Sequence, residues 1–272
     1  MTFREKYWKI YLRVEGYISA LLYPHAAMCP ICGEMRLVDE KYALCEDCMK
    51  RLDALHVPHG ACDRCLSPVR RGQGCNMCRS GRMKSIDRCY APFNYRAEVR
   101  KLVHEFKFEA VGSFMPYLSL MMTEALVDRD YDYLVPVPLN EQRLLDRGVN
   151  QARLLADGLS EKTGIPVMEA LDRKGYQKPQ SATPMEKRAE NVKGIFHANQ
   201  DLNGLRILLI DDVRTTGSTA QACAEELKQA GAAKVGLCTL AVVYRDPKKF
   251  RQKKRRKKFM GHSNYIHKTN IK

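Results

Sequence analysis

Apolar and polar residues follow different patterns in successive parts of this chain. In residues 3–22 the apolar side chains lie three or four positions apart, which predicts an amphipathic helix. Residues 28–80 contain few apolar residues and much Gly, Pro and charge, so hydrophobic burial alone is too small to fold them. From about residue 88 to 246, short apolar runs alternate with segments of helical period.

The alternating region predicts an α/β domain. Strands are expected at 89–95, 132–139, 167–171, 193–198, 205–211 and 235–243, and helices at 97–108, 113–128, 149–163 and 218–230. The run LRILLID at 205–211 is apolar throughout, as is typical of a strand buried on both faces of a parallel sheet. We therefore expect a doubly wound, mostly parallel sheet.

Charge is concentrated at the C-terminal end. Residues 248–272 contain eleven Lys or Arg and no Asp or Glu, against a net charge of +15 for the whole chain. A segment of this kind is expected to be disordered and to attract phosphates, either of nucleic acid or of an anionic membrane surface. A solvated tail without a dedicated ligand is the alternative.

The cysteines indicate metal binding. Eight of the eleven form four C-x-x-C pairs, at Cys29/Cys32, Cys45/Cys48, Cys62/Cys65 and Cys75/Cys78. Two such pairs supply the four thiolates of a structural Zn²⁺ site, so two zinc ions are expected. Spacing leaves crossed pairing and redox dithiols open as alternatives. No run approaches the ~20 apolar residues of a membrane span, and a reducing, cytoplasmic location is expected.

Two adjacent carboxylates end the strand at 205–211. Asp211 and Asp212 are followed by a Gly/hydroxyl loop that enters a helix, in the sequence ILLIDDVRTTGST at 207–219. Ligands of parallel sheets bind beyond the carboxyl ends of the strands, and a helix N-terminus favours a phosphate. The carboxylates suit ribose hydroxyls, with Mg²⁺ nearby. A strand-end turn and a helix N-cap would use the same residues, but the ordered combination favours a ribose 5-phosphate pocket.

This stretch resembles the PRPP (phosphoribosyl pyrophosphate) signature of type I phosphoribosyltransferases. The resemblance implies that Asp211 and Asp212 hold the ribose 2′- and 3′-hydroxyls and take part in catalysis. It also implies that one loop binds the 5′-phosphate, through Arg214, Thr215, Thr216, Gly217, Ser218 and Thr219. The segment VPVPLNEQRLLDRGVNQARLLA at 135–156 resembles the part of the family that carries the pyrophosphate loop. There Asn140, Gln142 and Arg143 are the expected ligands of the anion; a turn and an exposed helix face are the alternative.

The polar stretch 172–190 is long enough to be a lid. The resemblance implies that it closes over pyrophosphate, and the residues expected to act in it are Arg173, Lys178, Gln180 and Arg188. An ordinary solvated loop is the alternative. The family usually has a threonine where this chain has Gln177, which leaves the details of lid chemistry open.

Together these segments, from about residue 20 to 245, resemble the ComF/GntX family, in which a double zinc ribbon precedes a phosphoribosyltransferase-like domain. The expected organisation is a helix at 1–24, a double zinc ribbon at 25–85, the α/β domain at 86–246 and a basic tail at 247–272. The resemblance implies binding of PRPP with Mg²⁺, contact with single-stranded DNA during natural competence, and a competence helicase as a candidate partner. A PRPP-sensing adaptor without turnover and a nucleotide-salvage phosphoribosyltransferase are the alternatives.

Overall fold

The computed structural model describes residues 26–69, 75–108, 115–174 and 194–243. The expected helix at 1–24 and the basic tail at 247–272 lie outside these residues. Within them, no helix has both the length and the apolar character needed to cross a membrane.

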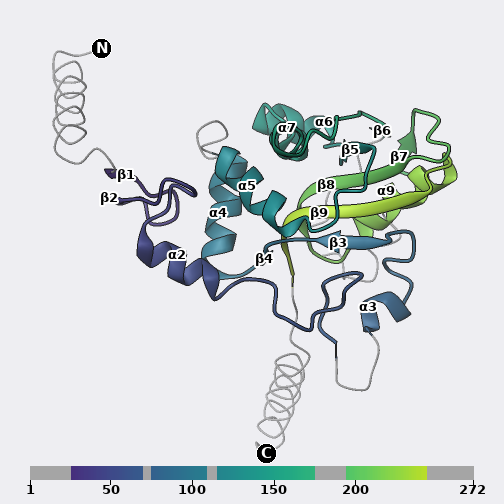
Figure 1. The fold of residues 1–272 in the computed structure, drawn as a ribbon. Helices are drawn as coiled ribbons and strands as arrows, with labels where there is room; N and C mark the ends of the chain where they lie inside the picture. Colours follow the sequence, from purple (N-terminus) through teal and green to yellow (C-terminus); the bar gives the residue numbers. More distant parts are fainter. Residues whose placement is uncertain (1–25, 70–74, 109–114, 175–193, 244–272) are drawn as a thin grey trace, which may run out of the picture.

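The core of the α/β domain is a parallel sheet, as expected (Figure 1). Its strands lie in the order β3 (Arg88–Tyr90), β9 (Lys234–Val242), β8 (Arg206–Arg214) and β5 (Tyr133–Pro136), and β4 (Phe93–Asn94) also pairs with β9. Leu209 of β8 pairs with Val135 on one side and Leu237 on the other, which fixes the register at the centre of the sheet. Every pairing in this sheet is parallel.

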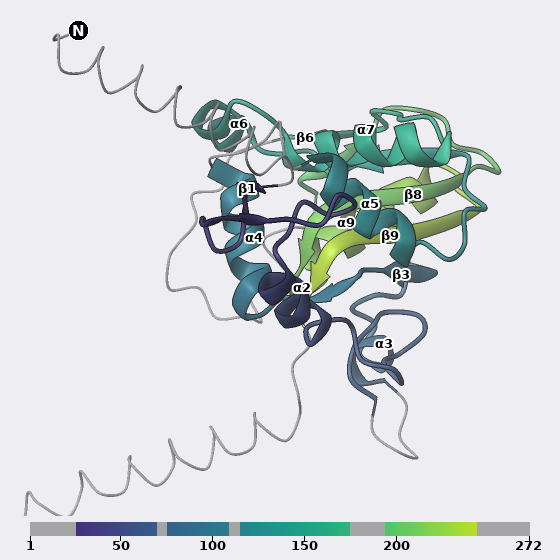
Figure 2. The ribbon, with the colours of Figure 1, turned by 60° about the vertical axis from the view of Figure 1, so that its left-hand side comes forward.

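Both faces of the sheet are covered, because side chains of β8 alternate between two clusters of buried residues. Leu208 and Ile210 pack with α4 (Ala97–Phe108), α5 (Met115–Ala125) and α7 (Gln151–Thr163). Ile207 and Leu209 pack on the other face with α9 (Ser218–Gln229). Figure 2 shows α5 and α7 in front of the sheet, with α9 on its far side. Burial on both faces of the sheet explains why the run at 205–211 is apolar throughout.

Several expected elements differ in extent. The bounds of the strand predicted at 167–171 are wrong. Val167 forms a single parallel bridge to Leu134. The strand that follows is β6 (Leu171–Arg173), which pairs antiparallel with β7 (Phe196–Ala198). The strand predicted at 89–95 is interrupted between β3 and β4.

The loop expected to present Asn140, Gln142 and Arg143 is instead the start of helix α6 (Glu141–Arg147), which agrees with the alternative of an exposed helix face. The side chain of Asn140 accepts a hydrogen bond from the backbone N–H of Arg143, and Gly148 ends the helix at a φ of 73°. Asn and Gly are common at the N-cap and C-cap of a helix, so Asn140 and Gly148 could have predicted this helix from the sequence.

The cysteine-rich segment forms two small units at separate places on the α/β domain (Figure 1). The first contains the hairpin β1 (Ala26–Met28) and β2 (Met35–Leu37) followed by α2 (Glu46–Asp53), and it lies beside α4 and α5. The second contains α3 (Asn76–Arg79) and lies next to β3.

Candidate functional site

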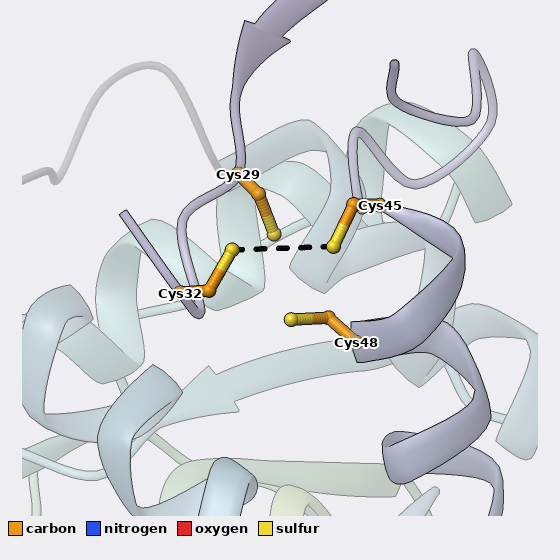
Figure 3. A group of neighbouring side chains, drawn as sticks. All are labelled: Cys29, Cys32, Cys45 and Cys48. Carbon is orange, nitrogen blue, oxygen red and sulfur yellow. Dashed lines mark hydrogen bonds between the residues drawn. The ribbon is translucent and has the colours of Figure 1, made fainter. Parts of the chain in front are cut away.

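The eight C-x-x-C cysteines gather into two groups of four. Cys29, Cys32, Cys45 and Cys48 form one group, and Cys62, Cys65, Cys75 and Cys78 form the other, with the sulfur atoms of each group all within 4.8 Å of one another. Figure 3 shows the first group, whose four side chains point toward a common centre.

The spacing of the sulfur atoms fits zinc. Zn–S bonds of about 2.3 Å in a tetrahedron place the sulfurs roughly 3.8 Å apart. The Sγ atoms of Cys32 and Cys45 are 4.0 Å apart, and those of Cys62 and Cys78 are 3.8 Å apart. Consecutive knuckles therefore pair, and the crossed arrangement that spacing left open is not the one adopted. Both groups have the donor set of a closed, structural zinc site.

The first ribbon is attached to helix α5. The Tyr42 hydroxyl donates to the carboxylate of Glu124, and Lys41 forms an ion pair with the same carboxylate at 2.6 Å. His56 continues the contact through a single antiparallel bridge to Phe93 of β4. These contacts lie away from the loop that follows β8.

The second ribbon is attached directly to that loop, residues 215–219, which we call the phosphate loop. Ser85, in the segment that follows the ribbon, donates its backbone N–H to the Gln221 side chain at 3.1 Å, and Gln221 donates back to the Ser85 hydroxyl at 2.9 Å. Met83 is fully buried against Gly217, where a Cβ would overlap its sulfur. A residue without a side chain is therefore required at position 217.

The acid pair lies near the carboxyl end of β8. Asp211 and Asp212 are partly exposed, and each accepts a hydrogen bond from the next backbone N–H, at 2.9 Å from Asp212 and 2.6 Å from Val213. A carboxylate oxygen of each residue is thus oriented by the backbone. This arrangement holds two carboxylates at the sheet edge where ligands of parallel sheets bind.

The phosphate loop turns directly into helix α9. Gly217 is the N-cap at a φ of 82°, and the hydroxyls of Thr216 and Ser218 lie 3.0 Å apart. Free N–H groups at the start of a helix and neighbouring hydroxyls are donors that suit a phosphate. Ser218 and Thr219 begin α9, while Thr215 is exposed before it.

Arg214 differs from the other residues of the expected 5′-phosphate group. It is the last residue of β8, and only 2% of its surface is exposed. Its three guanidinium nitrogens are buried and have no hydrogen-bond partner within the part of the chain that is described. The Arg214 charge lies close enough to Cys89 to oppose the effect of burial, which raises the pKa of that thiol to about 12. A buried guanidinium without a partner is costly, and an anion would compensate its charge.

The expected pyrophosphate ligands lie at the start of α6. Asn140 is buried and caps the helix, so its side-chain oxygen is already used by the Arg143 backbone. Gln142 donates to Asp146 at 3.1 Å on the exposed face of α6. Arg143 is left as the charged member of this group.

Two cations predicted from different segments come together. Burial and the nearby charge of Arg143 lower the pKa of Arg173 from its usual value, and the Arg173 guanidinium lies 5.3 Å from the centre of the Phe196 ring. Its Nε is buried without a hydrogen-bond partner among the described residues. Burial and the charge of Asp211 raise the pKa of the Cys223 thiol, and the charge of Arg173 opposes that shift. Arg143 thus lies within electrostatic reach of Arg173, and Arg173 and Asp211 both lie within electrostatic reach of Cys223.

The remaining lid residues, Lys178, Gln180 and Arg188, lie outside the described residues, as does most of the loop at 172–190. Their roles stay predictions.

Comparisons with known families agree with the two parts of the chain. The double zinc ribbon domain matches residues 18–79, and the phosphoribosyl transferase domain matches residues 144–270. Two solved structures are also similar. The purine phosphoribosyltransferase of Pyrococcus horikoshii is 26% identical, with 46% of this chain and 70% of that chain covered and a TM-score of 0.30. The glutamine PRPP amidotransferase of B. subtilis is 22% identical, with 50% and 30% covered and a TM-score of 0.35.

Three curated relatives match most of the chain. The DNA utilization protein YhgH of Salmonella typhimurium is 30% identical over 219 residues, which cover 78% of this chain and 88% of that protein. The competence protein ComFC of Bacillus subtilis is 28% identical, with 74% and 84% covered. Competence protein F of Haemophilus influenzae is 28% identical, with 74% and 91% covered.

Proposed function

The chain belongs to the family of the DNA utilization protein YhgH and the competence proteins ComFC and F, in which a double zinc ribbon precedes a phosphoribosyltransferase domain, and from this we propose that it binds PRPP with Mg²⁺ and handles single-stranded DNA during DNA uptake. The observation that carries the PRPP part is the joint placement of two carboxylates and a hydroxyl-rich helix N-terminus at the carboxyl end of β8.

In this proposal each group of residues at the carboxyl end of β8 binds one part of PRPP. Asp211 and Asp212 accept hydrogen bonds from the ribose 2′- and 3′-hydroxyls. The phosphate loop donates to the 5′-phosphate, with the N-terminus of α9 adding its dipole. The carboxylates of Asp211 and Asp212 would hold Mg²⁺ beside the ligand, since hard oxygen donors are its preferred ligands, and the ion would supply positive charge against the pyrophosphate.

The pyrophosphate group is the leaving group, and its charge needs cations. Arg143 and Arg173 supply two of them, and the pKa of Arg173 is lowered partly by the Arg143 charge. An anion between them would relieve that repulsion. Lys178, Gln180 and Arg188 of the lid would complete the enclosure. The protein's part in displacement at C1 is then electrostatic: the acid pair stabilises an oxocarbenium-like ribose, and the cations stabilise the departing pyrophosphate.

The DNA part of the proposal rests on the relatives and on charge. Their printed names concern DNA utilization and competence, and this chain has a net charge of +15. Proteins that bind single strands track the backbone with a positive surface. In this proposal the zinc module contacts the strand, and a competence helicase remains a candidate partner.

Calorimetry with PRPP and Mg²⁺ tests the pocket. The zinc-loaded protein should bind PRPP, and Asp211→Asn/Asp212→Asn should abolish detectable binding. Asp201→Asn/Glu161→Gln is the matched control: it also removes two exposed carboxylates, one ahead of β8 and one near the end of α7, and should bind as the wild type does. A folded wild type that does not bind PRPP would refute the proposal.

Turnover separates the alternatives. Release of pyrophosphate with an acceptor would identify a transferase, and release with a free nucleobase would identify a salvage enzyme. Stabilisation by PRPP without release for any acceptor would identify the sensing adaptor.

A further inference from the structure

A cavity of about 530 Å³ lies between the second zinc ribbon and the phosphate loop. Thr215 and Thr216 line it on the side of the α/β domain, and α3 and the residues around it line the other side. Neither Asp211 nor Asp212 is among its lining residues. The cavity therefore adjoins the phosphate loop without reaching the acid pair.

Its polar lining consists of donors and lacks carboxylates. Arg79 and Arg82 line it from the ribbon, together with the polar side chains of Asn76 and Ser80. Both arginines are exposed, and the Arg79 guanidinium donates only to the neutral Asn76 side chain, at 2.5 Å. Within the described part of the chain neither arginine forms an ion pair. A phosphate is the ligand class that two guanidinium groups without a carboxylate partner recognise best.

Two other cations nearby, Arg64 and Lys84, form contacts within the described part of the protein. Arg64 donates to the backbone oxygens of Ile86 and Lys84, and Lys84 forms an ion pair with Glu225 of α9 at 3.3 Å. Together with the reciprocal bonds between Ser85 and Gln221, these contacts fix the ribbon against the start of α9. The two walls of the cavity are therefore held at a set separation before any ligand binds.

We propose that this cavity binds a backbone phosphate of single-stranded nucleic acid, and that the second zinc ribbon supplies the arginines that bind it. This inference rests on the proposed function for the identity of its neighbour, the 5′-phosphate of PRPP. The cavity wall and the phosphate loop share Thr215 and Thr216, so two phosphates compete for the same hydroxyls and repel each other. PRPP and nucleic acid then weaken each other's binding by the same factor, because coupling between two ligands is reciprocal.

Fluorescence anisotropy with a labelled thymidine oligonucleotide of about 20 nucleotides measures the site in the zinc-loaded full chain. Arg79→Ala/Arg82→Ala should weaken binding by roughly ten- to hundredfold, and its salt slope should be less negative by about 0.7, for one phosphate of a single strand. Arg79→Lys/Arg82→Lys should recover most of the affinity. Arg129→Ala/Lys162→Ala removes the same charge from exposed positions ahead of β5 and near the end of α7 and should change affinity less than about twofold.

The same titration with saturating PRPP and Mg²⁺ measures the coupling. PRPP should lower the affinity of wild type for the oligonucleotide. It should lower the already weakened affinity of Arg79→Ala/Arg82→Ala only slightly. If Arg79→Ala/Arg82→Ala binds the oligonucleotide as tightly as wild type does without PRPP, the assignment is overturned. The same holds if the Arg129/Lys162 control loses as much affinity as Arg79→Ala/Arg82→Ala does. Wild-type affinity that does not respond to bound PRPP would overturn the shared-hydroxyl arrangement.

Two further readouts separate this inference from the proposed function. If wild type fails to bind PRPP in calorimetry, the proposed function fails, whereas the effect of the arginines on oligonucleotide binding stands by itself. If Arg79→Ala/Arg82→Ala loses PRPP binding but keeps oligonucleotide binding, the cavity belongs to PRPP. Competition by thymidine monophosphate or inorganic phosphate as strong as by the oligonucleotide would refute nucleic acid as the occupant.

Discussion

The contact between Gly217 and Met83 joins the phosphate loop to the second zinc ribbon, and Gly217→Ala tests it. Gly217 has a φ of 82°, a left-handed conformation that costs an L-residue about 1–2 kcal/mol. A Cβ at this position would also overlap the sulfur of the fully buried Met83. Overpacking of this kind costs about 1–3 kcal/mol. We expect Gly217→Ala to lower the free energy of unfolding by about 2–5 kcal/mol in total.

Gly204→Ala is the matched control. Gly204 has a φ of 78°, and no atom lies within 4 Å of the position where its Cβ would be. This variant should lose only the backbone contribution, about 1–2 kcal/mol. The difference between the two variants therefore isolates the overlap with Met83.

Urea denaturation of the zinc-saturated protein, followed by circular dichroism, measures both free energies of unfolding. In a Met83→Ala background the extra cost at Gly217 should disappear, leaving the two glycine substitutions about equal. Equal costs for Gly217→Ala and Gly204→Ala in the wild-type background would refute the claim that the ribbon is packed against the phosphate loop.

The two zinc sites and one ion pair give further predictions. Cys65→Ser and Cys32→Ser should each lower the zinc content, measured by mass spectrometry, from two ions per chain to one. Only Cys65→Ser should also weaken PRPP binding in calorimetry. Equal effects of the two substitutions on PRPP binding would contradict the separate attachment of the ribbons. Lys234 donates to the carboxylate of Asp128 at 2.8 Å and lowers the pKa of that carboxyl. Asp128→Asn should therefore cost about 0.5–1 kcal/mol of unfolding free energy at pH 7. Because the folded-state pKa of Asp128 is lowered, the stabilisation is complete above its ordinary pKa and is lost as the pH falls through the lowered one. The free energies of unfolding of wild type and variant should therefore begin to converge below about pH 4 and become equal only below the lowered pKa.

Local sequence was sufficient where an element carries its own signal. The strand expected at 205–211 and the helix expected at 218–230 correspond to β8 and α9, because a continuous apolar run and a Gly-Ser-Thr start identify them without knowledge of their neighbours. The C-x-x-C pairs identified the zinc ligands for the same reason. The pairing of the knuckles depends on distances between segments, so it emerged only from the structure.

Features that depend on distant residues were missed or misplaced. The strand expected at 167–171 shifted because its partner is β7, which the apolar pattern cannot specify. Helix α6 has no buried residue, so no apolar period marked it, although Asn140 and Gly148 were legible caps. The burial of Arg214 could not be read from a motif that presents this residue as part of an open loop, because its surroundings include Cys89 of a strand more than a hundred positions away.

The two ribbons differ in whether they contact the phosphate loop. Neither has enough apolar surface to fold without its metal, so each depends on zinc for its shape. The first contacts α5 through Tyr42 and Lys41, at a distance from the phosphate loop along the chain and in the fold. The second leads directly into Met83 and Ser85, which contact Gly217 and Gln221 at the start of α9. Disorder in the second ribbon would therefore release the N-terminus of α9 from its packing and remove one wall of the adjoining cavity, whereas disorder in the first would leave both in place. We therefore predict that zinc in the second site is required for PRPP to bind at the phosphate loop.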